Sequence, residues 1–450
     1  MSDRTLLRNG CVLTLDPALG NHRQADVLIE GSKIKAVAPN IPVGDAYVID
    51  ATDTIVMPGF VDTHRHIWEG ILRNIAPDAL LHDYFRDILG VLAPVYRPQD
   101  AYAGNLVSAY GAIDAGITTL LDWSHIQNTP EHTDASIAAL QESGLRAVFA
   151  YGTPNLDLAA WWYDSTLKHP TDIRRVAKQY FNGKDQLLTL ALAPRGPEFT
   201  TPEVSKHDWD LARELGVRIS VHVGVGEAGM KGRLGEMGKA GLLGPDTTYI
   251  HCCTLNDEEL QMIADTGGTV SLASPIELQM GHGTPPIQRC LDRGLRPSLS
   301  VDVETTMCGD LFAQMRSVLT LQRGQVNERR LRGETNLPQI LTSRDVIEFA
   351  TIEGAKANGL DSKVGTLTPG KEADVIMLRT DRINVLPIND PIGVVVRGMD
   401  SSNVDSVWIG GKPKKRHGHL VNVDLDRVTR LAYESRDYVV AKSGFVLPSI

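Results

Sequence analysis

The sequence Pro58-Gly-Phe-Val-Asp-Thr-His-Arg-His66 follows a short apolar run, Thr54-Ile-Val-Met57, and ends with two histidines that are separated by one residue. Side chains at positions i and i+2 of a β-strand project from the same face. We therefore expect His64 and His66 to point together from the end of a strand, while Arg65 points away. Two neutral imidazoles directed at one point suit a divalent transition metal ion. This segment predicts a strand that carries part of a metal site.

Further strand-like runs follow, and they alternate with helical stretches over residues 58–367. The runs are 117–122, 146–151, 187–194, 217–221, 247–250, 269–273 and 297–301. With the first strand they make eight, and this alternation predicts βα units around a parallel sheet. A (β/α)8 barrel carries its chemistry at the carboxyl ends of the strands. His222, His251 and Asp302 stand at three of these ends.

These residues, in this order, resemble the amidohydrolase superfamily of metal-dependent hydrolases. Pro58–His66 is similar to the first-strand signature of that superfamily. His222, His251 and Asp302 match its strand-five His, strand-six His and strand-eight Asp, and residues 351–374 are similar to its closing helix and return to a small β-domain. The resemblance spans nearly the whole chain. Within the superfamily, the chain resembles the branch that contains cytosine and guanine deaminases and the chlorohydrolase-like triazine hydrolases.

The two ends of the chain are expected to form a second, smaller domain. Residues 1–57 and 368–450 contain short strand-like segments, among them Ile392–Val396, separated by turn signals. Two independent β-domains would each be undersized, and in the resembled family both ends join one β-sandwich. We predict an α/β fold in which a TIM-type (β/α)8 barrel covers residues 58–367, beside a composite β-sandwich domain from residues 1–57 and 368–450.

The resemblance implies a mononuclear metal site. Four residues would bind one divalent ion, with zinc as the first choice and iron or manganese as alternatives: His64, His66, His222 and Asp302. The ion lowers the pKa of a bound water, and Asp302 would accept the proton of that water. His251 would lie in the second shell or hydrogen-bond the water and the developing tetrahedral centre. The fourth strand, 187–194, has no lysine to bridge two metal ions as in many relatives, so we predict a single ion.

The group that protonates the leaving amine departs from the family pattern. Deaminases of the resembled branch place a Glu three residues after the strand-five His, but here that position is Val225. The nearest carboxylate is Glu227, and the glycines at 224 and 226 would allow the loop to fold it toward the metal. We take Glu227 as a candidate catalytic residue, with a solvated loop position as the alternative.

Several polar and aromatic residues near the strand ends are candidates for substrate contacts. They are Trp68, Trp123, His125, Arg195, Ser274 and Glu277. Aromatic rings stack on planar ligands, and Arg195 is able to pair with a carboxylate or a ring oxygen. Rim packing and surface ion pairs are the alternative roles. Trp161-Trp162 is assigned to packing or to an oligomer surface.

The site predicts an amidohydrolase-type enzyme that activates water to attack a carbon–nitrogen bond other than a peptide bond. We expect an aminohydrolase, a deaminase of an N-heterocyclic small molecule. The alternatives are hydrolysis of an amide or cyclic amide, or a dechlorinating hydrolase, on the same site. A non-catalytic binding protein would be expected to have lost some of the ligands, and all are present.

The composition indicates which binding partners and which cellular compartment to expect. A net charge of -10 disfavours nucleic acid, and the basic run Lys412–Arg416 is interpreted as a solvated hairpin turn. Five cysteines without a paired spacing indicate a reducing compartment. Neither a leader peptide nor a membrane span is evident, so we expect a cytoplasmic protein. Its partner is a small-molecule substrate, and the relatives suggest a homo-oligomer.

Overall fold

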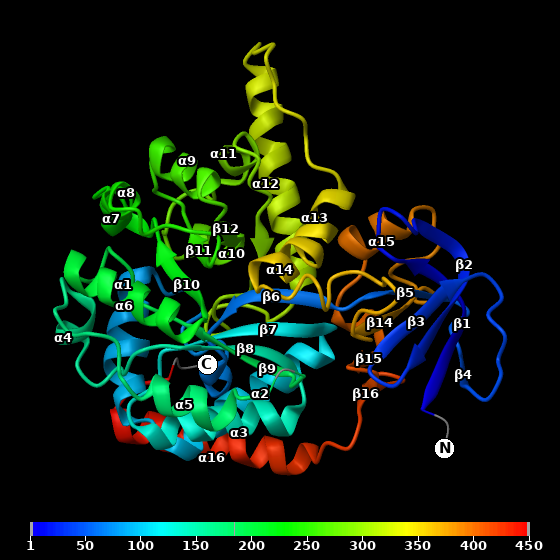
Figure 1. The fold of residues 1–450 in the computed structure, drawn as a ribbon, viewed down its shortest axis with the longest axis horizontal. Coiled ribbons are helices and arrows are strands. Elements are labelled where there is room, and N and C mark those ends of the chain that lie inside the picture. The colour runs from blue at the N-terminus through cyan, green and yellow to red at the C-terminus, as the bar shows by residue number, and fades with distance from the viewer. Residues whose placement is uncertain (1–2, 184, 448–450) are drawn as a thin grey trace.

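The computed structural model describes residues 3–183 and 185–447. Its centre is an eight-stranded parallel sheet in sequence order that curls into a barrel (Figure 1). The strands are β6 (Phe60–Arg65), β7 (Ile117–Ser124), β8 (Arg146–Tyr151), β9 (Leu188–Leu192), β10 (Arg218–Val223), β11 (Thr247–His251), β12 (Thr269–Leu272) and β13 (Ser298–Leu299). The predicted (β/α)8 barrel is confirmed.

Strand β13 is only two residues long. The barrel is closed by backbone hydrogen bonds of Asp302, which follows this strand. The Asp302 N–H donates to the carbonyl of His64 (3.0 Å), and the His66 N–H donates to the carbonyl of Asp302 (2.9 Å). Residues expected to bind a metal therefore also join the last strand region of the barrel to its first strand.

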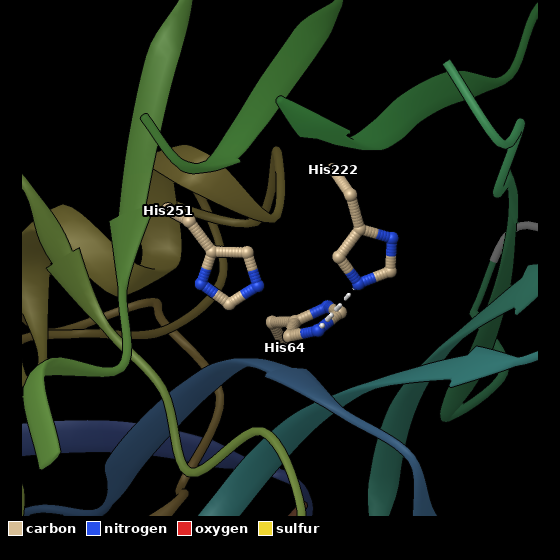
Figure 2. Close-up of side chains that lie close together, drawn as sticks. All are labelled: His64, His222 and His251. Atoms are coloured by element: carbon tan, nitrogen blue, oxygen red, sulfur yellow. Dashed lines mark hydrogen bonds between the residues drawn. The ribbon is translucent and has the colours of Figure 1, made fainter. Parts of the chain in front are cut away.

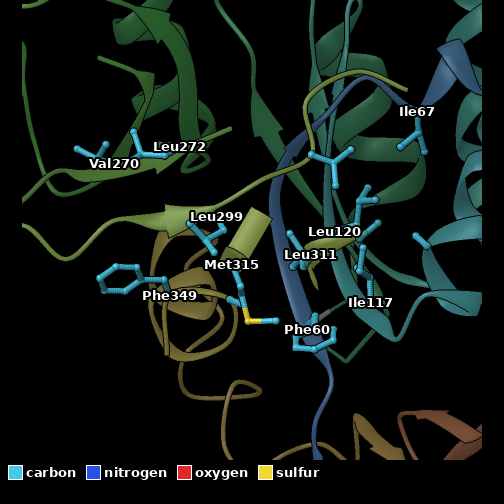
Figure 3. Packing of buried hydrophobic residues seen from close by; sticks show 14 of the residues in the cluster. Phe60, Ile67, Ile117, Leu120, Val270, Leu272, Leu299, Leu311, Met315 and Phe349 are labelled. Carbon is cyan, nitrogen blue, oxygen red and sulfur yellow. The ribbon is translucent and has the colours of Figure 1, made fainter. Parts of the chain in front are cut away.

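Helices cover the outside of the barrel. The longer ones that come from the barrel segment itself are α2 (Pro98–Asp114), α3 (Pro130–Ser143), α5 (Ile173–Tyr180), α6 (Pro202–Leu215), α9 (Asp257–Asp265) and α12 (Leu311–Leu331). Strands β6, β7 and β8 are buried over their whole length, as expected for a parallel sheet covered on both faces. Phe60, Ile117, Leu299 and Met315 are among the residues that pack between the strands and the surrounding helices (Figure 3).

Both ends of the chain contribute to one mixed sheet beside the barrel (Figure 1). Its strands are β1 (Arg4–Leu13), β2 (Asn21–Glu30), β3 (Lys33–Ala38), β4 (Tyr47–Asp50), β5 (Thr54–Pro58), β14 (Val375–Arg379), β15 (Val404–Ile409), β16 (Lys412–Arg416) and β17 (His419–Leu420). The two ends meet where β5 and β14 pair in antiparallel register. The predicted boundaries of the two domains remain a prediction.

Two local predictions for the C-terminal part were wrong. Ile392–Val396 is not a strand but lies in helix α15 (Pro391–Arg397), because Asp390 caps the amide N–H groups of Ile392 and Gly393. Lys412–Arg416 is not a solvated turn but strand β16, and the ammonium of the buried Lys415 donates to the Asp114 carbonyl (2.8 Å).

One terminal helix has no counterpart in the sequence prediction. Helix α16 (Leu425–Ser443) lies beside α2 on the barrel, although it belongs to the C-terminal segment (Figure 1).

None of the described helices combines the length and the apolar character that a membrane span requires.

A buried ion pair ties the barrel to the second sheet. On β8, Arg146 donates from Nε to Asp374 (2.7 Å) and from a terminal nitrogen to the same carboxylate (3.0 Å), and both side chains are almost fully buried. Replacing Arg146 with Met would leave the Asp374 carboxylate buried without its cation. We expect the free energy of unfolding to fall by about 3–5 kcal/mol, measured by urea denaturation.

The control for this prediction is Arg174→Met, since Arg174 makes a two-point pair with Glu214 in which both side chains are about half exposed. Breaking an exposed pair is expected to cost about 1 kcal/mol or less. Equal losses in the two variants would contradict a stabilising role for the buried pair.

Candidate metal centre

Five side chains converge at the carboxyl end of the barrel, and four strand ends bring them together. His64 lies on β6 and His66 directly after it, His222 lies on β10, His251 ends β11, and Asp302 follows β13. The imidazoles of His64, His222 and His251 face one another across the barrel mouth (Figure 2). Of the five residues, His64, His66, His251 and Asp302 are buried and His222 is partly exposed. The structure therefore assembles the whole predicted ligand set.

The distances between potential ligand atoms fit a single small cation. His64 Nε2 lies 3.1 Å from His222 Nε2 and 3.2 Å from Asp302 Oδ1, and His66 Nε2 lies 3.4 Å from the same oxygen. Bonds of roughly 2.0–2.1 Å at tetrahedral angles place neighbouring ligand atoms about 3.3 Å apart. Ligand atoms that lie within 4.8 Å of one another form two sets that share His64: His64, His66 and Asp302, and His64, His222 and His251. Imidazole nitrogens and a carboxylate oxygen are the donors that suit a zinc-like ion.

The protonation states also fit a cation site. Burial lowers the pKa of His64 to about 3 and holds the pKa of His222 well below its usual value, so both imidazoles are neutral. Burial by itself raises the pKa of Asp302, but hydrogen bonds with His64 and His66 and the nearby His251 bring it well below its usual value. Neutral imidazoles and an ionised carboxylate are the forms that bind metal ions.

Outer contacts orient two of the histidines. The Nδ1 atom of His66 lies 2.7 Å from the carbonyl oxygen of Trp123, which leaves Nε2 to face the centre. The Nδ1 atom of His251 lies 3.2 Å from the buried carboxylate of Glu277, and its Nε2 lies 3.7 Å from Asp302 Oδ2. Contacts of this kind fix the tautomer and the ring direction of histidines in metal sites.

Backbone strain is concentrated at the same place. His251 has a φ of 72° and Asp302 a φ of 70°, in the left-handed region that most side chains avoid. Each such residue costs of the order of 1–3 kcal/mol and persists where the surroundings enforce it. The strands therefore end abruptly, and both side chains turn into the barrel mouth.

A cavity of about 460 Å³, including its open mouth, lies directly above these side chains. Its polar lining residues are His66, Tyr84, His125, His222, His251, His282 and Asp302. Its apolar and aromatic lining residues are Leu81, Phe85, Leu89, Trp162, Phe199, Val225, Met280 and Val303. No lysine or arginine is among the described residues that line it.

Of the residues predicted to contact substrate, only His125 lines the cavity. Trp68 and Trp123 are fully buried behind it and donate their indole N–H groups to His125 Nδ1 (3.0 Å) and to the carbonyl of Ser220 (2.9 Å). Their geometry supports a role in orienting the cavity wall.

The other three predicted contacts are also turned toward protein groups. Arg195 donates to the carbonyls of Trp161 (2.6 Å) and Leu167. Ser274 Oγ accepts from the Ser317 hydroxyl (3.3 Å), and Glu277 accepts the Ala273 N–H (2.8 Å) beside His251. A direct substrate contact by Arg195, Ser274 or Glu277 has no support in these positions.

The candidate proton shuttle lies outside the cavity. Glu227 is exposed in the short helix α7 (Gly226–Gly229), which begins one residue after Val225 and turns the carboxylate to solvent. Its catalytic role remains a prediction that this geometry does not favour. Val225 itself lines the cavity, so this wall presents a valine side chain.

A buried acid holds the turn that carries Val225. Glu198 accepts the N–H of Gly224 and, at 3.4 Å, the N–H of Val225. Burial raises the pKa of Glu198 from 4.5 to about 7, although these two hydrogen bonds lower it. The sequence gives no local pattern that would have identified this residue.

The raised pKa of Glu198 predicts a pH dependence of stability. The folded chain binds the Glu198 proton more tightly than the unfolded chain does, so this contribution is complete below pH 4.5 and is lost as the pH rises to about 7. We expect it to amount to about 3 kcal/mol. Urea unfolding across this pH range should show a flatter profile for Glu198→Gln than for the native protein. Identical profiles would contradict the prediction.

Comparison with known proteins places this site in a family. The model of the family described as "Amidohydrolase family" matches residues 55–414. The 5'-deoxyadenosine deaminase of Methanothermobacter thermautotrophicus is 29% identical over 440 residues, which cover 94% of this chain and 97% of that protein. The 5-methylthioadenosine/S-adenosylhomocysteine deaminase of Pyrococcus abyssi is 27% identical over 436 residues, which cover 94% and 96% of the two chains.

Solved structures show the same fold. A zinc-bound adenosine deaminase from Xanthomonas campestris superposes with a TM-score of 0.82 at 19% identity, covering 97% of this chain and 98% of that one. Atrazine chlorohydrolase from Arthrobacter aurescens, complexed with zinc, gives a TM-score of 0.85 at 22% identity, covering 96% and 100%. The family match, the barrel and the convergent histidines and aspartate agree, and this chain is a hydrolase that belongs to the amidohydrolase family.

Proposed function

We propose that this protein is a metal-dependent deaminase that releases ammonia from a small heterocyclic amine. The observation that carries the proposal is the convergence of His64, His66, His222 and Asp302 at a cavity lined by both polar and aromatic side chains. His64 lies 3.1 Å from His222 and 3.2 Å from Asp302, and His66 lies 3.4 Å from Asp302. These residues would hold a divalent ion, which would lower the pKa of a bound water toward neutrality.

The side chains around that position are arranged for hydrolysis. Asp302, which is ionised, accepts a proton from the attacking water and passes it on toward the leaving amine. His251, whose Nδ1 faces Glu277, presents Nε2 toward the attacking water as a hydrogen-bond partner. The aromatic rings of Trp162, Phe85 and Phe199 line the cavity and offer faces for a planar ring.

The names of the relatives support the amine class. Both relatives described above are deaminases of adenosine derivatives, and each matches this chain over almost its full length. We propose an amino group on an aromatic nitrogen ring as the reacting group, and zinc as the ion, because both similar structures carry zinc. A homo-oligomer in a reducing, cytoplasmic setting remains part of the proposal, in keeping with five free cysteines.

A second candidate function follows from Val225. Since the cavity wall there offers no carboxylate, a substrate whose leaving group departs without protonation, such as chloride from a chlorinated ring, would also suit the site. Hydrolysis of a cyclic amide is the third possibility on the same residues.

The test is product release by the zinc-loaded protein from matched compounds. Ammonia is measured with 5'-deoxyadenosine, 5-methylthioadenosine, adenine, guanine, cytosine and melamine, and chloride is measured with the chlorinated analogues of the same rings. Ammonia release from at least one amine supports the deaminase. Chloride release alone would replace it with the second candidate, and release from none would refute both.

A further inference from the structure

His282 is a buried imidazole that faces the cavity without a hydrogen-bond partner. Its side chain lines the cavity and is 4% exposed, and neither ring nitrogen has a partner among the described residues. Buried polar atoms nearly always have partners, so two orphan nitrogens on one ring call for an explanation. Their place at the cavity surface points to a group on a molecule that enters the cavity.

Apart from the Nδ1 atom of His222, which has no partner in the described part of the chain, the other polar groups of the cavity have partners or belong to the metal centre. Trp68 donates to His125 Nδ1 (3.0 Å), so the neutral ring carries its proton on Nε2 and directs it to the Tyr84 hydroxyl (3.3 Å). Tyr84 in turn donates to the buried Glu69 (2.6 Å). The remaining polar lining residues belong to the centre described above: His66, His222, His251 and Asp302.

The backbone fixes His282 beside the wall formed by Val225. The His282 N–H donates to the Glu277 carbonyl (3.0 Å), and the His282 carbonyl accepts the N–H of Gly226 (2.8 Å), the residue that follows Val225. The His282 ring stands at 81° to the His251 ring, with centroids 4.6 Å apart. The ring is therefore held at the edge of the reacting centre, next to the turn that carries Val225.

His282 offers both kinds of hydrogen bond. A neutral imidazole carries one N–H donor and one acceptor nitrogen, and both ring nitrogens of His282 are without a partner among the residues that the structure describes. An amino group attached to a nitrogen ring presents the complementary pair, an N–H donor beside an acceptor ring nitrogen.

We propose that His282 is a substrate-contacting residue that hydrogen-bonds the amino group or the adjacent ring nitrogen of the amine, on the wall where Val225 offers no polar side-chain atom. This assignment rests on the proposed deaminase function and deepens it. It gives the cavity a polar contact for a heterocyclic amine that is separate from the metal centre.

The experiment compares two substitutions in the zinc-loaded protein. His282→Phe keeps a planar ring without nitrogen atoms, and His282→Gln keeps a donor and an acceptor. With the panel amine that the native protein converts fastest, we expect kcat/KM to fall by about 10- to 100-fold in His282→Phe, the cost of leaving a buried hydrogen-bonding atom unpaired. We expect a much smaller loss in His282→Gln. Equal activities of the two variants would overturn the assignment.

Metal content separates this role from metal binding, because one nitrogen of His282 lies within 4.8 Å of ligand atoms of His251 and Asp302. We expect the same metal content in native protein and both variants. Two equivalents in native protein and one in His282→Phe would make His282 a ligand and overturn the proposal.

A binding measurement keeps the inference independent of turnover. Calorimetric titration of the zinc-loaded proteins with the panel amines is expected to show weaker binding by His282→Phe than by His282→Gln. If native protein releases no ammonia but this contrast in affinity holds, the deaminase proposal fails and the His282 contact stands. If the two variants bind equally, the contact fails whatever the activity.

Discussion

Replacing Asp302 with Asn is expected to lower kcat for the preferred amine by about 10²–10⁴-fold, the usual contribution of a positioned proton acceptor. Asn has nearly the same size and tolerates the left-handed backbone found at this position, with its φ of 70°. The barrel should therefore remain folded while the amide is unable to accept a proton. The measurement is kcat together with metal content, so that weakened metal binding is recognised.

Asp310→Asn is the matched control. Asp310 caps helix α12 by accepting the N–H of Ala313 (2.9 Å), and Asn is an equally good cap. This variant should keep native activity and stability. An Asp302→Asn protein within tenfold of native kcat would contradict the role of Asp302 as proton acceptor.

Replacing His64 and His66 together with Ala is expected to reduce bound metal from about one equivalent per chain to none, and to abolish hydrolysis. The double variant removes two of the three predicted nitrogen ligands, which are His64, His66 and His222. Elemental analysis of protein purified without chelators measures the loss, and addition of zinc should not restore activity.

The chain contains its own control for this prediction. His417 and His419 repeat the His-x-His spacing, but both are exposed: His417 precedes strand β17 and His419 begins it. Replacing this pair with Ala should leave metal content and activity unchanged. Native protein that contains no metal and takes up none would refute the metal centre itself.

The same two pairs show what the sequence was able to predict. His-x-His at 64 and 66 was informative because an apolar strand precedes it and three further strand ends carry His222, His251 and Asp302. The pair at 417 and 419 has no such context. Strand ends are predictable because apolar periodicity locates the strands, and a parallel barrel brings their carboxyl ends together.

The cavity wall was harder to predict, since it comes from loops whose paths depend on tertiary packing. Trp162 was assigned to packing or to an oligomer surface, yet it lines the cavity together with Phe199. His282 lies between two glycines with positive φ, in a loop without hydrophobic periodicity. The position of its side chain was therefore not predictable from such a pattern. Glu227 failed to reach the cavity because helix α7 starts at Gly226.

The closure of the barrel around Asp302 has a consequence for the order of folding. The aspartate carboxylate meets His64 across 238 residues of chain, so the site is complete only after nearly all of the barrel has been synthesised. Contacts of such long sequence separation carry a large entropic cost before they form. A metal ion bound to His64 and Asp302 would stabilise the closed barrel. The free energy of metal binding would then contribute to the free energy of folding.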